Sequence, residues 1–154
     1  MYVLPDRIRE DIEFELGEID LLFQMYQKEL LDVETSPNLV ELTALAGVLH
    51  SFYNGIEKIL IIISKNIDKD IPSDFNWHRT LLEQMAKANK NRKAVLTDDI
   101  KKELLKYLGF RHFFRHSYSF HLKWERMEDL VKPIRTVWEK FKAEILAFDI
   151  EVDA

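Results

Sequence analysis

The segment FRHFFRHSYSFH, residues 110–121, holds the side chains of this sequence that are best suited to chemistry. Its twelve positions contain two arginines, three of the chain's five histidines, one tyrosine and four phenylalanines. Guanidinium groups bind phosphate in a planar, bidentate geometry, and imidazoles exchange protons near neutral pH. Aromatic rings stack on nucleic-acid bases. These are the residue types that a phosphodiester-cleaving site requires.

If residues 110–124 form one helix, their aromatic and cationic side chains separate onto different faces. The face directed toward the core carries Phe110, Phe113, Phe114, Ser117, Phe120, His121 and Trp124. A second face carries Arg111, Arg115 and Tyr118, and a third face beside it carries His112, His116 and Ser119. The simplest interpretation is that these polar faces are only solvated. The alternative is a binding or catalytic surface, because solvated faces elsewhere in the chain consist mostly of Lys, Glu and Asp.

The spacing of His112 and His116, four residues apart on a helix, is one that can hold zinc. A zinc site needs further ligands, and on the helical model His121 points away from this pair toward the core. No acidic residue lies between residues 111 and 124. We therefore predict no metal site, and we predict that His121 is a hydrogen-bonded histidine of the core.

The composition predicts an all-α protein with a single domain, residues 1–154. Hydrophobic residues make up 47% of the chain, and glycine and proline number only four each, too few for a sheet protein with many tight turns. The absence of cysteine excludes a disulfide scaffold and a thiol nucleophile. The N-terminus does not resemble a signal peptide, and no apolar stretch approaches the length of a membrane span. We expect a soluble, cytoplasmic protein that does not contact a membrane.

The charge of the chain is unevenly distributed. The formal net charge is −5, whereas a protein held to nucleic acid by general electrostatics is usually basic. Residues 6–34 carry many acids, but residues 110–126 contain one acid, Glu125, and four bases, namely Arg111, Arg115, Lys123 and Arg126. Any binding of nucleic acid must therefore depend on this local patch.

Apolar periodicity predicts an antiparallel bundle of about five helices. The expected helical segments are residues 5–33, 37–66, 77–88, 98–108 and 124–148. Ser36 is the expected cap of the second helix, and Gly109 is expected to end the fourth. Pro133 is expected to kink or break the last helix. Gly47 and Gly55 are expected to let neighbouring helices approach the second helix closely.

The second helix is apolar around most of its circumference, which predicts a central position in the bundle. Asn54 and Glu57 interrupt its apolar surface. Because a buried carboxylate is rarely unpaired, Glu57 either forms a salt bridge or hydrogen bond within the bundle or orients the arginine and histidine group. His50 and His78 are expected to be structural or on the surface. The core is expected to include Trp77, Trp124 and Trp138.

Arg111, His116 and Tyr118 form the pattern R-x4-H-x-Y, which resembles the signature of the HEPN-domain family, and specifically of HepT-like ribonuclease toxins. The context agrees: an all-α chain of this length, SFYNGIEKIL in the second helix, WHRTLLEQ in the third, and the motif before a long final helix. The resemblance covers nearly the whole chain. One position departs from it, because many HEPN proteins carry a small polar residue where this chain has His112. This histidine either adds a second titrating group or weakens ribonuclease action.

The resemblance implies a homodimeric, metal-independent endoribonuclease toxin that needs no cofactor and leaves a 2′,3′-cyclic phosphate on its RNA substrate. It implies that Arg111 and His116 are catalytic: the arginine binds the phosphate, and the histidine exchanges a proton with the ribose 2′-hydroxyl or the leaving 5′-oxygen. On a helix these two residues are about 140° apart, which favours a dimer that brings two motifs together. The supporting candidates are His112, Arg115, Asn54 and Glu57.

The resemblance also implies a partner, a nucleotidyltransferase antitoxin that silences the toxin by attaching AMP to Tyr118. The added bulk and negative charge would block phosphate binding at Arg111. Without that role, Tyr118 is most simply an aromatic residue of an interface. Two other functions stay open: a non-catalytic HEPN dimer that acts as the binding partner of a nucleotidyltransferase, and a purely structural helical bundle.

Overall fold

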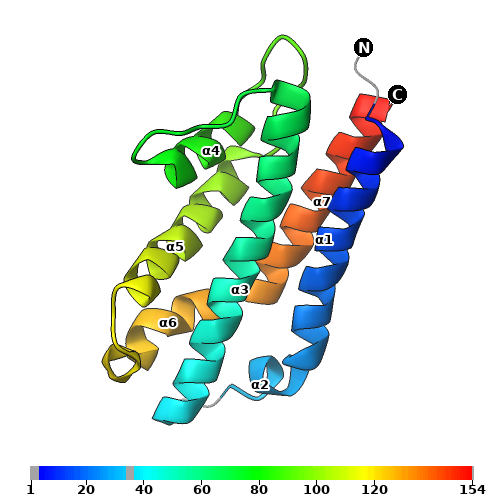
Figure 1. Cartoon of the computed structure of the whole chain (residues 1–154). Coiled ribbons are helices and arrows are strands. Elements are labelled where there is room, and N and C mark those ends of the chain that lie inside the picture. Colours follow the sequence, from blue (N-terminus) through cyan, green and yellow to red (C-terminus); the bar gives the residue numbers. More distant parts are fainter. Residues whose placement is uncertain (1–3, 34–36, 154) are drawn as a thin grey trace.

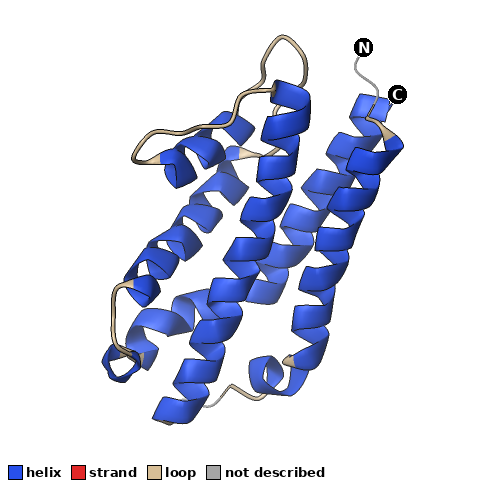
Figure 2. Cartoon of the chain, in the orientation of Figure 1, coloured by secondary structure: helices blue, strands red, loops and turns tan. Residues whose placement is uncertain are grey.

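The computed structural model describes residues 4–33 and 37–153, with side chains as far as Phe148 (Figure 1). These residues are mostly helical, and no strand occurs among them (Figure 2). The all-α prediction is confirmed, but the described residues form seven α-helices rather than five. They are α1 (Asp6–Met25), α2 (Gln27–Leu31), α3 (Leu39–Ile63), α4 (Trp77–Met85), α5 (Asp98–Arg115), α6 (Trp124–Val131) and α7 (Ile134–Asp153). A π-helical turn, η1 (Ser64–Asp68), extends α3, and a 3-10 turn, η2 (Ser119–His121), follows α5.

Two interruptions account for the additional helices. The segment predicted as one helix over residues 5–33 breaks at Tyr26, whose φ of −109° and ψ of 21° leave the helical region, so α2 is separate from α1. The predicted final helix breaks at Pro133, because proline removes a backbone donor and its ring clashes with the preceding turn. α6 therefore ends at Val131 and α7 begins at Ile134, as expected of this proline.

α3 begins with a capping box. The side-chain oxygen of Asn38 accepts a hydrogen bond from the backbone N–H of Glu41 at 2.9 Å, and the Glu41 carboxylate accepts one from the backbone N–H of Asn38 at 3.1 Å. These two bonds satisfy backbone donors that the start of a helix would otherwise leave free. Asn38 thus caps the helix in place of the predicted Ser36, which lies outside the described residues.

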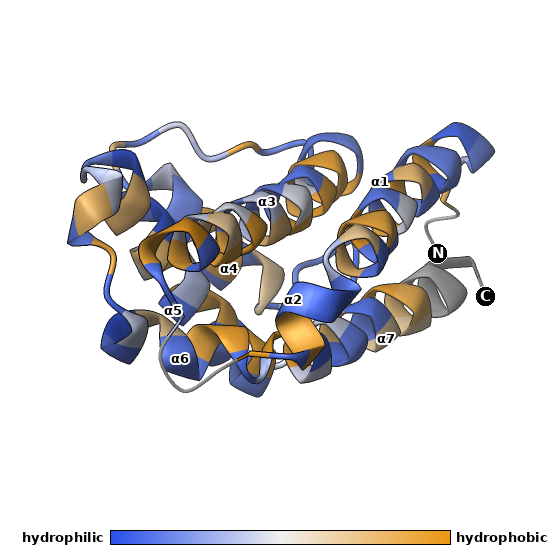
Figure 3. Ribbon diagram, turned by 90° about the horizontal axis from the view of Figure 1, so that it is seen from below, coloured by the Kyte–Doolittle hydropathy of each residue, from blue (hydrophilic) through white to orange (hydrophobic). Residues whose placement is uncertain are grey.

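The predicted central position of α3 is confirmed. It packs against α1, α4, α5 and α6, while α7 packs against α1 and α5 (Figure 1). Apolar residues run along α3 and along the side of α1 that faces it (Figure 3). Several α3 side chains are completely inaccessible to solvent, among them Phe52, Ile56, Ile59 and Leu60. Trp124 and Trp138 are also in the core as predicted, whereas Trp77 is only partly buried against it.

α3 is long enough and apolar enough to meet the criteria of length and hydropathy for a membrane-spanning helix. Together with η1 it makes a 30-residue helix, Leu39–Asp68, which is the one such candidate among the described residues, and 56% of its apolar window is buried inside the protein. The expectation that no segment approaches this composition was wrong. A central helix needs apolar residues on nearly every side for the same reason that a membrane helix does.

Close approach between α1 and α3 depends on Gly55. A Cβ atom at this position would stand 2.7 Å from Cγ1 and 2.8 Å from Cδ1 of Ile19, closer than van der Waals contact allows. The prediction of close packing is therefore confirmed at Gly55. It is wrong at Gly47, because a Cβ atom there would have nothing within 4 Å.

A buried ion pair fixes the end of α3 against the segment that follows α4. Nε and Nη2 of Arg92 donate to the two carboxylate oxygens of Asp68 at 2.6 and 2.7 Å, and both side chains are almost inaccessible to solvent. Burial by itself would raise the pKa of Asp68, but hydrogen bonds from Arg92, Gln84 and Asn89 outweigh it and hold the pKa below its ordinary value. This pair fastens α4 in place beside α3.

α5 continues past Gly109 and ends at Arg115. The prediction that Gly109 ends the helix was wrong, because no glycine adopts the left-handed conformation that a C-terminal glycine cap uses. Phe110 instead extends the buried side of the helix and packs against the rings of Phe113 and Phe114. The Arg111 to Arg115 turn is therefore part of a continuous, 18-residue helix.

Candidate functional site

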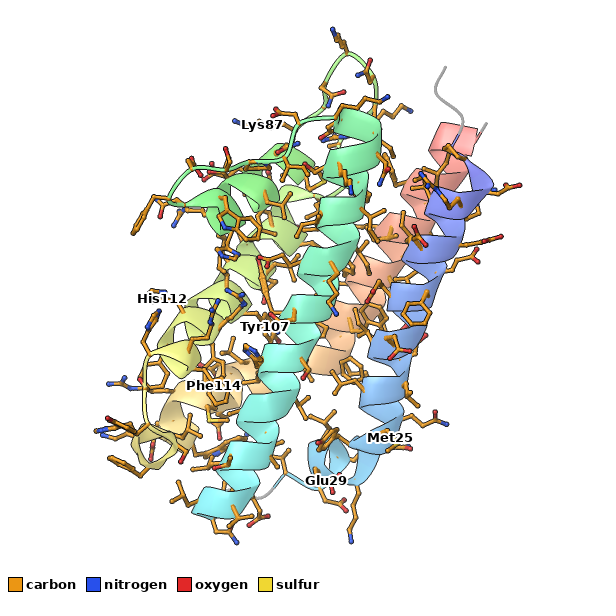
Figure 4. All side chains as sticks on the ribbon, in the orientation of Figure 1. Met25, Glu29, Lys87, Tyr107, His112 and Phe114 are labelled. Atoms are coloured by element: carbon orange, nitrogen blue, oxygen red, sulfur yellow. The ribbon has the colours of Figure 1, made fainter. Side chains whose placement is uncertain are left out.

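Aromatic packing sets the orientation of the last turns of α5. The ring of Phe114 stacks on Phe110, with centroids 6.0 Å apart, and lies 5.4 Å from the ring of His50 on α3. In Figure 4, Phe114 lies on the side of α5 that faces α3, whereas His112 lies on the opposite, outer side. The predicted anchoring role of Phe110, Phe113 and Phe114 is confirmed, since all three pack on the core.

A chain of hydrogen bonds joins Arg111 on α5 to two polar residues of α3. Nε of Arg111 donates to Oδ1 of Asn54 at 2.9 Å, and Nδ2 of Asn54 lies 3.1 Å from Nε2 of His50. The guanidinium group only donates hydrogen bonds, so the Asn54 oxygen must face it and the Asn54 amino group must donate to the imidazole. Nε2 of His50 is thus an acceptor, and its proton resides on Nδ1.

His50 is held in its neutral form at this site. Burial is the main cause of its lowered pKa, and the positive charges of Arg111 and Arg115 lower the pKa further. Nδ1 of His50 is buried and has no hydrogen-bond partner among the described residues. Protonation would remove the acceptor that Asn54 uses and add a third positive charge beside two arginines. A neutral imidazole is therefore part of the arrangement that holds Arg111.

His112 and His116 form a pair at the C-terminal end of α5. Their ring centroids are 4.7 Å apart, and both side chains are exposed. His116 is the C-cap residue, with its backbone N–H donating to the carbonyl of Phe113 at 3.2 Å. His116 is therefore an accessible imidazole beside a helix end, whereas Arg111 is directed toward α3.

The chain leaves the helix after Arg115, which corrects the single-helix model of residues 110–124. Tyr118 has an extended backbone, with φ −80° and ψ 148°, and precedes η2, so it does not share a helical face with Arg111. His121 and Phe120 are exposed rather than buried in the core. Beyond this turn the chain returns to the core, where Leu122 and Trp124 are buried.

Glu57 forms a pair across the α3–α4 interface. It is 6% exposed, and its Oε2 accepts a hydrogen bond from Nδ1 of His78 at 2.7 Å. The His78 ring stacks on Trp77 with a centroid distance of 3.6 Å. Burial and then the Glu57 carboxylate raise the pKa of Tyr53 above its ordinary value, while Arg111 acts in the opposite direction. Of the two alternatives for Glu57, the structure contains the hydrogen bond within the bundle, and the residue that contacts Arg111 is Asn54.

His50 and His78 were expected only to be structural or on the surface, whereas they contact Asn54 and Glu57, the two polar residues of α3 that were named as candidates. His50, Asn54 and Glu57 are spaced at i, i+4 and i+7, which places them on one side of α3, and this spacing was the available signal. Their partners, His78 on α4 and Arg111 on α5, lie far away in the sequence, and no spacing pattern connects them with α3. Among the described residues, no group of three or more His, Asp or Glu side chains is arranged to hold a metal ion.

The sequence was compared with models of known protein families. The model described as HepT-like protein matches residues 44–152, more than half of the chain. The chain belongs to the HepT-like family. The matched part of this HepT-like protein includes His50, Asn54 and Glu57 of α3 and the whole segment from Arg111 to Tyr118. No curated protein and no solved structure matches the chain significantly.

Proposed function

We propose that this HepT-like protein is a metal-independent endoribonuclease toxin whose catalytic residues are Arg111 and His116. One observation carries the proposal: the last turns of α5 hold both a fixed cation and exposed imidazoles. Asn54 accepts a hydrogen bond from the Arg111 guanidinium, and the exposed pair His112 and His116 lies at the end of the same helix. A fixed cation and a titrating imidazole are what cleavage of a phosphodiester requires. The segment also lies within the HepT-like match.

The reaction that these groups support is an internal transfer within RNA. The ribose 2′-oxygen attacks the adjacent phosphorus, and the bond from phosphorus to the 5′-oxygen breaks. The 2′-hydroxyl gives up its proton and the 5′-oxygen takes one up, so the products are a 2′,3′-cyclic phosphate and a 5′-hydroxyl. His116 exchanges one of these protons, and Arg111 stabilises the charge that develops on the phosphate oxygens. Arg115 adds a positive charge on the same helix, and the His112 ring lies beside that of His116.

The proposed enzyme is a homodimer. Within one chain, Arg111 is bonded to Asn54 on the α3 side, and His116 contacts His112 on α5 itself. A two-fold arrangement places the arginine of one protomer beside the histidine of its partner and so completes a site that a single chain leaves divided.

Cleavage of a structured RNA in the presence of a chelator tests the enzyme. We expect the wild-type protein to cleave, and His116→Ala and Arg111→Ala each to lower the rate by about 100-fold or more. Arg79→Ala is the matched control, because it removes an exposed arginine of α4 that pairs with Glu83 on the same helix. Full activity of Arg111→Ala would contradict the phosphate-binding role.

We further propose that a nucleotidyltransferase antitoxin silences the protein by attaching AMP to Tyr118. Tyr118 is 72% exposed and lies three residues beyond the end of α5, so its hydroxyl is open to a modifying enzyme. Incubation with a nucleotidyltransferase and ATP is expected to increase the intact mass by one adenylate. Tyr118→Phe should abolish this increase, while Tyr26→Phe, which alters another exposed tyrosine, should retain it. A mass increase that survives Tyr118→Phe would place the modification elsewhere.

A second function is favoured by the different partners of the two residues within the single chain, because Arg111 bonds to Asn54 on α3 and His116 contacts His112 on α5. If a dimer does not bring Arg111 and His116 together, the protein is a non-catalytic partner that binds a nucleotidyltransferase. Absence of cleavage by the wild-type protein, together with tight association with a nucleotidyltransferase, distinguishes this function from the enzyme.

A further inference from the structure

Three exposed rings gather at the turn that follows α5. Tyr118 and Phe120 are 72% and 65% exposed, and their rings are parallel within 5°, with centroids 5.3 Å apart. The centroid of the His121 ring lies 4.6 Å from that of Phe120 and 6.5 Å from that of Tyr118, and its plane is inclined by 39° and 36° to theirs. We name Tyr118, Phe120 and His121 the ring cluster.

The backbone holds the ring cluster in place. His121 N–H donates to the carbonyl of Tyr118 at 2.9 Å, and Leu122 N–H donates to the carbonyl of Ser119 at 3.1 Å. Leu122 and Trp124, directly after the turn, are buried in the core. A short turn that is hydrogen-bonded internally and anchored on one side presents its rings without a large cost in conformational entropy.

Solvent exposure of the ring cluster is not explained by packing. Phe120 is 65% exposed, so in the single chain it gains little of the stabilisation that burial in a core gives a phenylalanine. Grouped exposed aromatic rings mark binding surfaces more often than isolated ones do. Because Tyr118 and Phe120 are both mostly exposed, the stacked pair can accept a further planar group.

The charges around the ring cluster select the class of ligand. Arg115, Lys123 and Arg126 are exposed close to it in sequence, and the guanidinium of Arg126 lies 5.8 Å from the ring centre of Phe113. Glu125 is the one acidic residue in positions 110–126, although the whole chain carries a net charge of −5. Aromatic rings among cations are the combination that binds single-stranded nucleic acid, in which bases stack on the rings and phosphates approach the cations.

We propose that the ring cluster is a stacking subsite for an unpaired base of single-stranded RNA. The proposal rests on the proposed function in taking RNA as the ligand. It adds that the RNA must be unpaired there, since the bases of a duplex are stacked on each other and their faces are not available. Stacking does not read base edges, so the subsite discriminates weakly among sequences. An adenylate on Tyr118 would compete with RNA for the same rings.

Binding rather than cleavage tests the subsite. Fluorescence anisotropy is measured with a labelled oligouridylate and with a duplex RNA of equal length, using His116→Ala protein so that the RNA stays intact. Adding Phe120→Ala should weaken oligouridylate binding by about tenfold, since stacking of a base contributes roughly 1–3 kcal/mol. Duplex binding should change much less. Phe120→Trp, which keeps an aromatic ring at this position, should restore the affinity.

Phe14→Ala is the matched control, because Phe14 is 63% exposed on α1, outside the basic patch. Unchanged oligouridylate binding by Phe120→Ala overturns the subsite, as does an equal loss for duplex RNA. If Phe120→Ala separates a dimer into monomers, the ring cluster is a contact between two copies of the chain and the proposal is wrong. Failure of the wild type to cleave RNA would overturn the enzyme alone, because the binding measurement does not depend on catalysis.

Discussion

Asn54 determines how Arg111 is presented. Its amide oxygen accepts from the guanidinium group and its amino group donates to His50, so each end of one amide has a defined partner. Hydrogen bonds to charged groups stabilise by about 1.5–3 kcal/mol, which is enough to favour one orientation of a long side chain. At the residue scale, the candidate site is therefore a pre-oriented arginine rather than a freely moving surface cation.

The lowered pKa of His50 predicts a specific dependence of stability on pH. The unfolded chain binds a proton at His50 below about pH 6.5, while the folded protein resists it until lower pH. The free energy of unfolding should therefore fall as the pH drops from about 7.5 to about 5.5. Urea denaturation should show a smaller fall for His50→Gln than for the wild type.

His121→Gln is the control for the His50 measurement, since it removes an exposed imidazole outside the α3–α5 contact and should keep the wild-type dependence. If His50→Gln loses as much stability on acidification as the wild type does, then His50 is not held neutral by burial and the two arginines.

At the scale of the elements, α3 is the helix that positions the site. One side of it carries His50, Asn54 and Glu57, which contact Phe114, Arg111 and His78, respectively. The opposite flank packs on α1 through Gly55 and Ile19. The distance between α1 and α3 is therefore one determinant of where the polar side of α3 meets α5.

Two glycines of α3 should respond oppositely to alanine substitution. Gly55→Ala places a Cβ atom against Ile19, and we expect a net loss of up to about 2 kcal/mol, because overpacking costs about 1–3 kcal/mol and helix propensity returns about 1 kcal/mol. Gly47→Ala meets no neighbour and should stabilise the protein by up to about 1 kcal/mol. Chemical denaturation measures both.

Ile19→Val provides an internal check on the Gly55 prediction. Removing Cδ1 takes away one of the two atoms that the new methyl group would meet, so Gly55→Ala should cost less in this background. Equal effects of Gly55→Ala and Gly47→Ala would show that close packing of α1 on α3 does not depend on the glycine.

At the scale of the whole molecule, the question is whether the site is shared between two chains. A mixture of Arg111→Ala and His116→Ala proteins tests the proposed dimer directly. Each variant should be inactive alone, but mixed dimers contain one site with an intact arginine from one protomer and an intact histidine from the other. After subunit exchange of equal amounts, cleavage should reach about a quarter of the wild-type rate, since about half of the dimers are mixed and each has one complete site of two.

Analytical ultracentrifugation accompanies the mixing assay and reports whether the chain is dimeric at the concentration used. A dimer whose mixture stays inactive would place Arg111 and His116 in the same protomer's site. A monomeric wild type that cleaves RNA would overturn the shared site altogether.

Periodicity predicted most of the helices and the central place of α3, because these depend on local spacing of apolar residues. It missed the break at Tyr26 and the end of α5 at Arg115. Both are local changes of backbone conformation, at Tyr26 and at His116, that apolar spacing does not signal. Extending a helical period through residues 116–124 consequently placed His121 and Phe120 in the core, although both are exposed.

The sequence by itself determined the helical class, the HepT-like pattern at Arg111, His116 and Tyr118, and the local excess of positive charge around them. These are properties of neighbouring residues. Only the tertiary structure decided that Asn54 holds Arg111, that His50 stays neutral beside it, that Glu57 pairs with His78, and that the ring cluster remains in water. The physical reason is that contacts between helices depend on how the helices are rotated and spaced when they pack, and packing is determined by the whole core.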